Sequence, residues 1–369
     1  MAIDYNSRID RLKNRRRGLD QTLSLESYAY DSVLQESLKE IEKHKYERES
    51  WENRSNTAIV KYALGAMEEV DSKYTDISIK TAERIENQLY DRLKNKGIYT
   101  RYRLQGSVPL NIHIKGISDV DLLVIDDSLF TYDAYGPKAS SYHPATNSNI
   151  NVLKRLREES VQSLGDAFPK VKVDISGSKS IKLTGGSLAR DVDVVPSTWN
   201  NTYAYQISDK EEDRGINIYD SANQKSTFNL PFKHISLIKT KCLNNKGSLR
   251  KSIRLCKNLK ADLIAEGTKI YLSSYDLASL MYHVRDIDLF DASSHDLLVL
   301  YMTQQHFDKL YRNKEYTLSL DTPDSTRKII DNEDKFRSLL FLSCALDELV
   351  ALVCDSLGVS KENLKYVSV

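Results

Sequence analysis

The sequence has no long hydrophobic run. Its most apolar region, residues 339–354, contains Asp347 and Glu348 and falls short of the ~20 apolar residues that a membrane-spanning helix needs. The first twelve residues, MAIDYNSRIDRL, also lack the apolar stretch of a secretory signal. We therefore expect a soluble, cytoplasmic protein without a membrane partner, in which residues 339–354 form a buried helix.

Cysteine is scarce and the net charge is close to zero. The 369 residues contain 53 Lys and Arg against 52 Asp and Glu, so the overall charge predicts no polyanionic partner. No CxxC pair and no Cys/His spacing typical of a zinc site is present, so we expect reduced thiols in the core. The four cysteines are Cys242, Cys256, Cys344 and Cys354.

Acidic residues are absent from residues 221–261, a stretch rich in Lys and Arg. A helix with Ser248 as its N-cap would place Arg250, Arg254 and Lys257 on one face, because they are four and then three residues apart. A triphosphate or a nucleic-acid backbone would suit that face. A merely solubilising surface is the weaker alternative, because no acidic residues are interspersed.

The first 98 residues are helical in character. Residues 36–43 are rich in charge and indicate a solvated helix face, while Ile59, Ala63 and Met67 recur at helical spacing. The run Arg15-Arg16-Arg17 is interpreted as an exposed helix end rather than a nucleic-acid site, because acidic residues follow soon after.

Two aspartates open an apolar run within LQGSVPLNIHIKGISDVDLLVI, residues 104–125. If DVDLLVI is a β-strand, Asp119 and Asp121 project from one face, and Val120, Leu122 and Val124 project from the other. Carboxylates held this close repel each other unless a cation lies between them, and such oxygen ligands suit Mg²⁺. The preceding Gly106-Ser107 turn offers N–H groups and a hydroxyl for phosphate oxygens.

The acidic pattern returns in LARDVDVVP, where Asp191 and Asp193 share one face of an expected strand. If the two acidic strands are neighbours in one sheet, three or four carboxylates converge. Asp126 and Asp127, which follow the first strand, are interpreted as loop or helix-cap residues. The other expected elements are a polar loop at 126–149, a helix at 151–168, strands at 171–175, 180–183, 203–208 and 215–219, and helices from residue 231 onward.

These motifs resemble a known family. The order Gln105-Gly106-Ser107, Asp119-Val120-Asp121 and Asp193-Val194-Val195-Pro196 is similar to that of the DNA polymerase β-type nucleotidyltransferases. More narrowly, the chain resembles the bacterial CD-NTases and cyclic GMP-AMP synthase, which make cyclic or linear oligonucleotide second messengers. The segments PFKHISLIKTKCLNNKG, RLCKNLK and LSSYDLASL follow that family's helical domain in order, so the similarity covers most of residues 55–300.

The resemblance implies a bilobed α/β (α+β) fold. A polymerase β-like core would carry the carboxylates on a twisted mixed sheet packed on N-terminal helices, and a C-terminal helical bundle lobe would close over the nucleotide. The expected parts are an N-terminal helical segment at 1–55, the nucleotidyltransferase core at 56–230 and the helical domain at 231–369.

The resemblance also implies roles for individual residues. Asp119, Asp121 and Asp193 would be the catalytic carboxylates and hold two Mg²⁺ ions, with Mn²⁺ as an alternative. Asp193 would serve the attack of a 3′- or 2′-hydroxyl on the α-phosphorus, which releases pyrophosphate. Asp191 is a weaker candidate. The phosphate- and base-binding residues would be Gln105, Gly106, Ser107, Lys257, Ser274 and Tyr275, of which Tyr275 would stack on the donor base.

Two departures from the family pattern are visible. Ile112 stands where the family often has Thr, five residues after the motif serine, which leaves the backing of the phosphate turn open. No zinc-binding His/Cys insertion follows Asn245, which favours a bacterial antiphage enzyme over the DNA-sensing animal form. The seven histidines show no spacing suited to a metal site, so no chemistry is assigned to them.

The leading hypothesis is a Mg-dependent synthase that condenses NTPs, with ATP and GTP as candidates, into a cyclic di- or trinucleotide for antiphage (CBASS) signalling. A protein regulator is a further candidate partner, and nucleic-acid binding stays open. One alternative is a template-independent enzyme that extends RNA or makes oligoadenylate. Another is a non-catalytic nucleic-acid or partner-binding protein that retains the fold; clustered carboxylates, which repel polyanions, argue against it.

Overall fold

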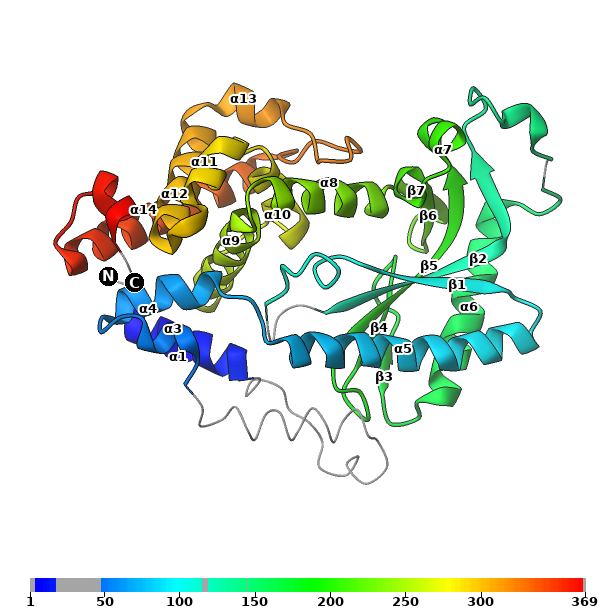
Figure 1. The fold of residues 1–369 in the computed structure, drawn as a ribbon. Helices are drawn as coiled ribbons and strands as arrows, with labels where there is room; N and C mark the ends of the chain where they lie inside the picture. Colours follow the sequence, from blue (N-terminus) through cyan, green and yellow to red (C-terminus); the bar gives the residue numbers. More distant parts are fainter. Residues whose placement is uncertain (1–3, 18–47, 115–118, 144, 368–369) are drawn as a thin grey trace.

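The computed structural model describes residues 4–17, 48–114, 119–143 and 145–367. They form a lobe built on a β-sheet and a helical lobe that lie side by side (Figure 1). The charge-rich stretch at residues 36–43 lies outside the described residues. Among the helices that the structure describes, none is both long and apolar enough to cross a membrane.

A mixed sheet forms the first lobe, as expected. Its strands are β1 (Thr100–Gln105), β2 (Val120–Tyr132), β3 (Lys172–Asp174), β4 (Ile181–Thr184), β5 (Val192–Asn201), β6 (Gly215–Asp220) and β7 (Lys225–Asn229). Their order is β1-β2-β5-β4-β3, and the second half of β5 pairs with β6, which pairs with β7. Strands β2 and β5 run parallel at the centre, and the other pairs are antiparallel.

Helices cover the sheet and build the second lobe. They are α1 (Tyr5–Arg17), α3 (Ser50–Asn53), α4 (Ala58–Met67), α5 (Ser72–Asn95), α6 (Asn149–Ala167), α7 (Tyr203–Ser208), α8 (Pro231–Asn244), α9 (Ser248–Ala265), α10 (Ser274–Tyr282), α11 (Asp286–Asp291), α12 (Asp296–Arg312), α13 (Lys314–Ser319) and α14 (Glu333–Leu357). Helix α14 confirms the expected buried helix. All four cysteines are free; three are buried as expected, but Cys344 is exposed.

Alternation along β2 separates the two faces of the sheet. Val120 and Leu122 join a core formed with α5 and α6, whereas Leu123 and Ile125 belong to a smaller core on the opposite face. Because side chains two residues apart share a face, Asp121 points to the same side as Leu123. The carboxylates therefore lie on the face that α8 approaches through Phe232.

The N-terminal helices are divided between the two lobes. Only α5 packs on the sheet, whereas α1, α3 and α4 share one hydrophobic core with α8 to α14. Arg15 of α1 donates to Asp262 of α9 at 2.8 Å, and Tyr62 of α4 donates to the same carboxylate at 2.6 Å. Arg15 is buried, so the interpretation of Arg15-Arg16-Arg17 as an exposed helix end is wrong at Arg15. The division at residues 55 and 230 stays a prediction.

Residues 203–208 form helix α7 rather than the expected strand. The hydroxyl of Thr202 accepts the N–H of Tyr205 at 3.0 Å and caps the helix, and Asp209 ends it in the left-handed region at φ 55°. The alternating aromatic residues imitate a strand, but the Thr202 cap satisfies a backbone donor at the start of the helix.

Strand β2 continues to Tyr132, so the polar loop begins after that residue rather than at Asp126. Asp126 lies opposite Thr100 of β1, and its carboxylate accepts the N–H of Ser128 at 2.8 Å. Asp126 and Asp127 are therefore strand residues. Sequence periodicity missed this extension because a register shift between Asp126 and Phe130 breaks the alternation.

Candidate functional site

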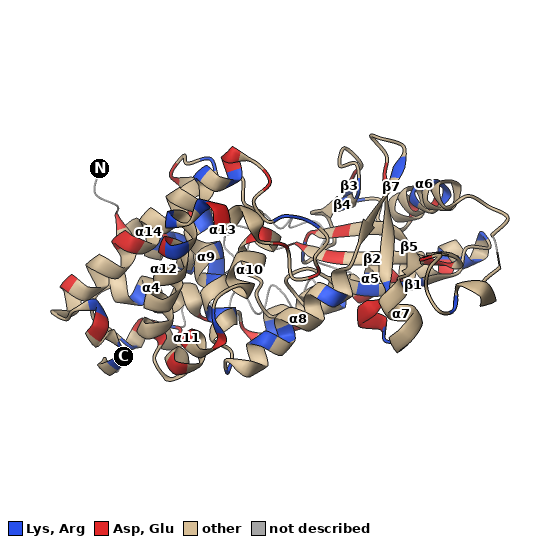
Figure 2. Ribbon diagram, turned by 90° about the horizontal axis from the view of Figure 1, so that it is seen from above, with Lys and Arg blue, Asp and Glu red and all other residues tan. Residues whose placement is uncertain are grey.

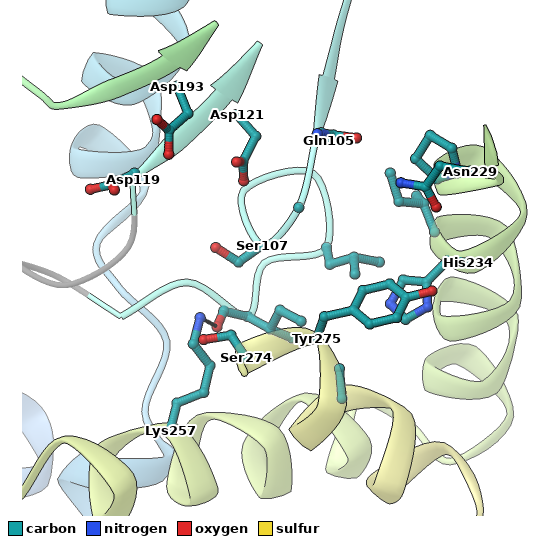
Figure 3. Close-up of a pocket in the computed structure, with 16 residues that line it drawn as sticks. Gln105, Ser107, Asp119, Asp121, Asp193, Asn229, His234, Lys257, Ser274 and Tyr275 are labelled. Carbon is teal, nitrogen blue, oxygen red and sulfur yellow. Dashed lines mark hydrogen bonds between the residues drawn. The ribbon is translucent and has the colours of Figure 1, made fainter. Parts of the chain in front are cut away.

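A cavity of about 360 Å³ lies between the two lobes (Figure 3). The structure brings all nine predicted site residues together in its lining, whereas Asp191 is not part of it. The sheet lobe contributes Gln105, Gly106, Ser107, Asp119, Asp121 and Asp193, and the helical lobe contributes Lys257, Ser274 and Tyr275.

The parallel pairing of β2 with β5 sets the carboxylates side by side. Asp121 lies directly opposite Asp193, and Gln105 of β1 lies opposite Asp121 on its other side. Asp119 immediately precedes β2. Figure 2 shows acidic positions on the central strands at the end of the sheet that lies nearest the helical lobe. The two acidic strands, β2 and β5, are thus neighbours. This is the condition under which the sequence predicts that their carboxylates converge.

The negative charges of Asp121 and Asp193 are only partly compensated by nearby lysines. Burial, and then the charges of Asp193 and Asp119, raise the pKa of Asp121 to about 7; burial also raises the pKa of Asp193. Carboxylates with raised pKa values on one cavity wall are a donor set that fits a hard divalent cation. As the side chains lie, no three Asp, Glu, His or Cys of the described residues are placed to hold a metal. Asp119 instead pairs with Lys182, at 2.6 Å between Nζ and Oδ2.

The Gly106-Ser107 turn lies directly against this acidic wall. Gly106 has φ 75°, and a Cβ at this position would overlap the Asp121 carboxylate, so the turn requires glycine. The N–H of Ile112 donates to the carbonyl of Ser107 at 3.1 Å. The Ile112 side chain is buried in the core of the helical lobe. Apolar packing therefore holds the end of the turn where the family often has threonine.

Three cations of α9 bind the carbonyl groups that follow the turn. The bonds are Arg250 Nε to Leu110 O (3.0 Å), Arg254 Nη1 to Asn111 O (2.8 Å) and Lys257 Nζ to Ile112 O (2.9 Å). They connect the helical lobe to the segment that carries Gly106 and Ser107. Burial lowers the pKa of Lys257 to about 7, so an anionic ligand would favour its charged form.

The prediction of an open basic surface on α9 is therefore corrected. Arg250, Arg254 and Lys257 do share a face, but Arg254 and Lys257 are only 4% and 3% exposed. The N-cap of α9 is Gly247 rather than Ser248. Other cations of the same stretch pair with acids from elsewhere in the chain: Lys233 with Asp213, Lys241 with Asp286, and Lys251 with Asp296.

Replacing Arg254 by Leu is expected to lower the free energy of unfolding by about 2–4 kcal/mol, because the carbonyls of Asn111 and Met67 lose a charged donor. Thermal or urea unfolding measures the loss. Exposed Lys239 lies in the same basic stretch, and Lys239→Leu is the matched control with little expected effect. Equal stability of the two variants would contradict the role of Arg254 in joining the lobes.

The first turn of α10 contributes Ser274 and Tyr275 to the cavity wall. Ser273 caps this helix in a reciprocal arrangement with Asp276, which fixes Ser274 and Tyr275 at the cavity wall. The hydroxyl of Tyr275 donates to Asp324 at 2.8 Å. The capped helix therefore fixes the backbone of Tyr275, and Asp324 fixes its hydroxyl group.

Sequence reasoning missed His234, which also lines the cavity. Its ring stacks on Tyr275 with centroids 4.2 Å apart and an interplanar angle of 26°, so it covers one face of the predicted base platform. Burial lowers the pKa of His234 to about 4, so the ring is neutral near pH 7. The available signal was its place in the first turn after Pro231. Asn229, at the end of β7, was missed as well.

Known proteins share both the sequence and the fold. No protein-family model matches the chain. The cyclic dinucleotide synthase CdnE of Yersinia aleksiciae is 43% identical over 355 residues, which span 95% of this chain and 92% of that protein. The c-di-GMP synthase of Capnocytophaga granulosa is 33% identical over 312 residues, 77% of this chain and 84% of that protein.

Solved structures agree with these relatives. The STING-associated CdnE c-di-GMP synthase from Capnocytophaga granulosa superposes with a TM-score of 0.71 at 28% identity, covering 96% of this chain and 100% of that one. A STING-associated CdnE c-di-GMP synthase from Flavobacteriaceae sp. has a TM-score of 0.73 at 21% identity over 96% of this chain and 100% of that one, which shows the shared fold. The predicted bilobed fold and the resemblance to CD-NTases are confirmed. This chain belongs to the CdnE-type cyclic dinucleotide synthases, the nucleotidyltransferases that condense NTPs into cyclic dinucleotides.

Proposed function

We propose that the cavity between the lobes is where this chain joins two NTPs, with Asp119, Asp121 and Asp193 as the catalytic carboxylates. The observation that supports this assignment is the register of Asp121 opposite Asp193 on parallel strands, beside the Gly106-Ser107 turn. A hydroxyl of one nucleotide attacks the α-phosphorus of the other, and pyrophosphate leaves. A second displacement within the linear dinucleotide closes the ring, so each cyclic product releases two pyrophosphates.

The carboxylates would hold divalent cations, two Mg²⁺ ions or Mn²⁺ in their place. A bound divalent cation neutralises negative charge on the phosphate oxygens of the donor. Asp121 and Asp193 meet across one strand pair, so their oxygens are directed to the same space (Figure 3). Burial and neighbouring carboxylates raise the pKa of both groups, and a divalent cation between them would offset this repulsion.

The remaining lining residues orient the nucleotides. The N–H groups of the Gly106-Ser107 turn and the Ser107 hydroxyl would bind donor phosphates, with Gln105 at the end of β1 beside them. Lys257 would exchange the carbonyl of Ile112 for a phosphate oxygen, and Ser274 would assist it. Tyr275 would stack on the donor base in place of one of its present ring neighbours, His234 or Arg327.

The expected biological setting follows from the substrates and from the family. NTPs are available in the cytoplasm, where we place the enzyme. Its product would act as a second messenger in bacterial antiphage signalling, and a protein regulator stays a prediction. Family membership argues against the two alternatives, an RNA-extending enzyme and a non-catalytic binding protein.

Mass spectrometry of the product made from all four NTPs and Mg²⁺ tests this proposal. We expect a phosphatase-resistant species with the mass of a cyclic dinucleotide. Isotope-labelled NTPs identify its two bases. Extension of an RNA primer without any small product would favour the RNA-extending alternative. If neither a cyclic dinucleotide nor an extended primer forms, although the protein still binds NTPs, the result would favour the non-catalytic binding protein.

A further inference from the structure

Lys182 lies in line with Asp121 and Asp193 across neighbouring strands of the sheet. Across the neighbouring strands β1, β2, β5 and β4, Gln105 lies opposite Asp121, Asp121 opposite Asp193, and Asp193 opposite Lys182. Side chains directly opposite each other on neighbouring strands project from the same face of the sheet. Lys182 therefore belongs to the acidic wall, although the DxD pattern of the sequence gives no hint of it.

The Lys182 side chain is bound to Asp119. Its Nζ lies 2.6 Å from Asp119 Oδ2, and the two side chains keep 41% and 32% of their surface exposed. Figure 3 shows the Asp119 carboxylate directed away from Asp121 and Asp193. This position agrees with the lack, among the described residues, of any group of three acidic, His or Cys side chains placed to hold a metal.

We infer that Lys182 is a built-in counter-cation that competes with the divalent metal for Asp119. In the metal-free protein its ammonium group offsets part of the negative charge of the wall and holds Asp119 aside. The carboxylate must leave Lys182 before it can join Asp121 and Asp193 around a cation. This inference rests on the metal-holding role proposed for the three aspartates.

Replacement of Lys182 by a divalent cation as the partner of Asp119 is favourable. An ion pair with both partners partly in water is only weakly stabilising, because solvent screens it. A divalent cation brings twice the charge of the ammonium group and accepts several oxygen ligands at once. The metal therefore displaces Lys182 when the nucleotide brings it, while Lys182 limits binding of the metal alone.

Binding of Mn²⁺ to the full chain without nucleotide tests the inference, with free Mn²⁺ measured by electron paramagnetic resonance. We expect Lys182→Gln to bind Mn²⁺ about threefold to fivefold tighter, as loss of an exposed ion pair predicts. Lys182→Arg, which keeps the charge, should stay near wild type. Lys172→Gln is the matched control, because Lys172 on β3 carries the same charge on the same sheet and is exposed.

Two further measurements separate competition from a general charge effect. In an Asp119→Asn background, Lys182→Gln should no longer tighten Mn²⁺ binding, because the lysine then has no carboxylate to withhold. In EDTA, Lys182→Gln should melt at a lower temperature than wild type and gain more from added Mn²⁺, because the carboxylates then repel one another without a counter-cation.

Each contrary outcome is distinct. Unchanged or weaker Mn²⁺ binding by Lys182→Gln would overturn the inference, as would equal tightening in the Asp119→Asn background. Wild-type protein that binds no Mn²⁺, and does not differ from Asp121→Asn, would refute the metal-holding role itself and the inference with it. Wild-type binding that Asp121→Asn abolishes, with Lys182→Gln unchanged, would refute the inference alone.

Discussion

Replacing Asp193 by Asn is expected to reduce cyclic dinucleotide formation by about 10³-fold, several kcal/mol of lost charge stabilisation in the transition state. Asn keeps the size of the side chain but removes the negative charge that faces Asp121 on the neighbouring strand. Pyrophosphate release measures the rate. The melting temperature should not fall, because neutralising one of two repelling carboxylates relieves the native state.

Asp191→Asn is the matched control for this prediction. Asp191 precedes the same strand by one residue and is also half-buried with a raised pKa, yet it does not line the cavity. Its substitution should change the rate by less than about tenfold. If Asp191→Asn and Asp193→Asn were equally impaired, the assignment of Asp193 as the catalytic residue of β5 would be wrong.

Replacing Gly106 by Ala is expected to reduce the rate by at least about 10²-fold through misplacement of catalytic groups. The added methyl group would overlap the Asp121 carboxylate, so either the turn or the carboxylate must move. The variant should also lose some stability, because alanine is strained at φ 75°. Steady-state kinetics should show the main loss in kcat, since the displaced group acts on the reacting phosphate.

The Gly97→Ala variant separates the effect of backbone strain from the effect of displacing the turn or the Asp121 carboxylate. Gly97 has nearly the same backbone angle, φ 73°, but nothing lies within 4 Å of an added Cβ. It should lose a similar stability, about 1 kcal/mol, and keep its activity. Equal activity of the Gly106 and Gly97 variants would show that the contact between the turn and Asp121 does not matter for catalysis.

The acidic wall shows how far strand periodicity can be trusted. Alternation alone predicted that Asp119 and Asp121 share a face, and Val120 between them, like Leu122, does enter the opposite core. Periodicity does not predict that β2 pairs with β5. The register that sets Asp121 opposite Asp193 depends on strand order, which residues seventy positions apart do not encode locally.

Helix α9 shows where composition misleads. Helical spacing correctly placed Arg250, Arg254 and Lys257 on one face, but the absence of acidic residues in 221–261 wrongly suggested that this face is open, because composition cannot tell whether a face meets water or another lobe. The partners of these cations are backbone carbonyls of residues 110–112, which every sequence possesses. Likewise, capping by Thr202 overrode the strand-like alternation of residues 203–208.

By itself, the sequence determined the acidic strand starts, the glycine turn and the order of motifs that matches the CD-NTases, because spacing within one element fixes which side chains share a face. Tertiary structure alone decided which elements meet. It set Lys182 beside Asp119, stacked His234 on Tyr275 and turned the α9 cations towards the carbonyl groups of residues 110–112. These contacts join residues far apart in the chain, and their energies depend on burial and distance, which only the folded chain defines.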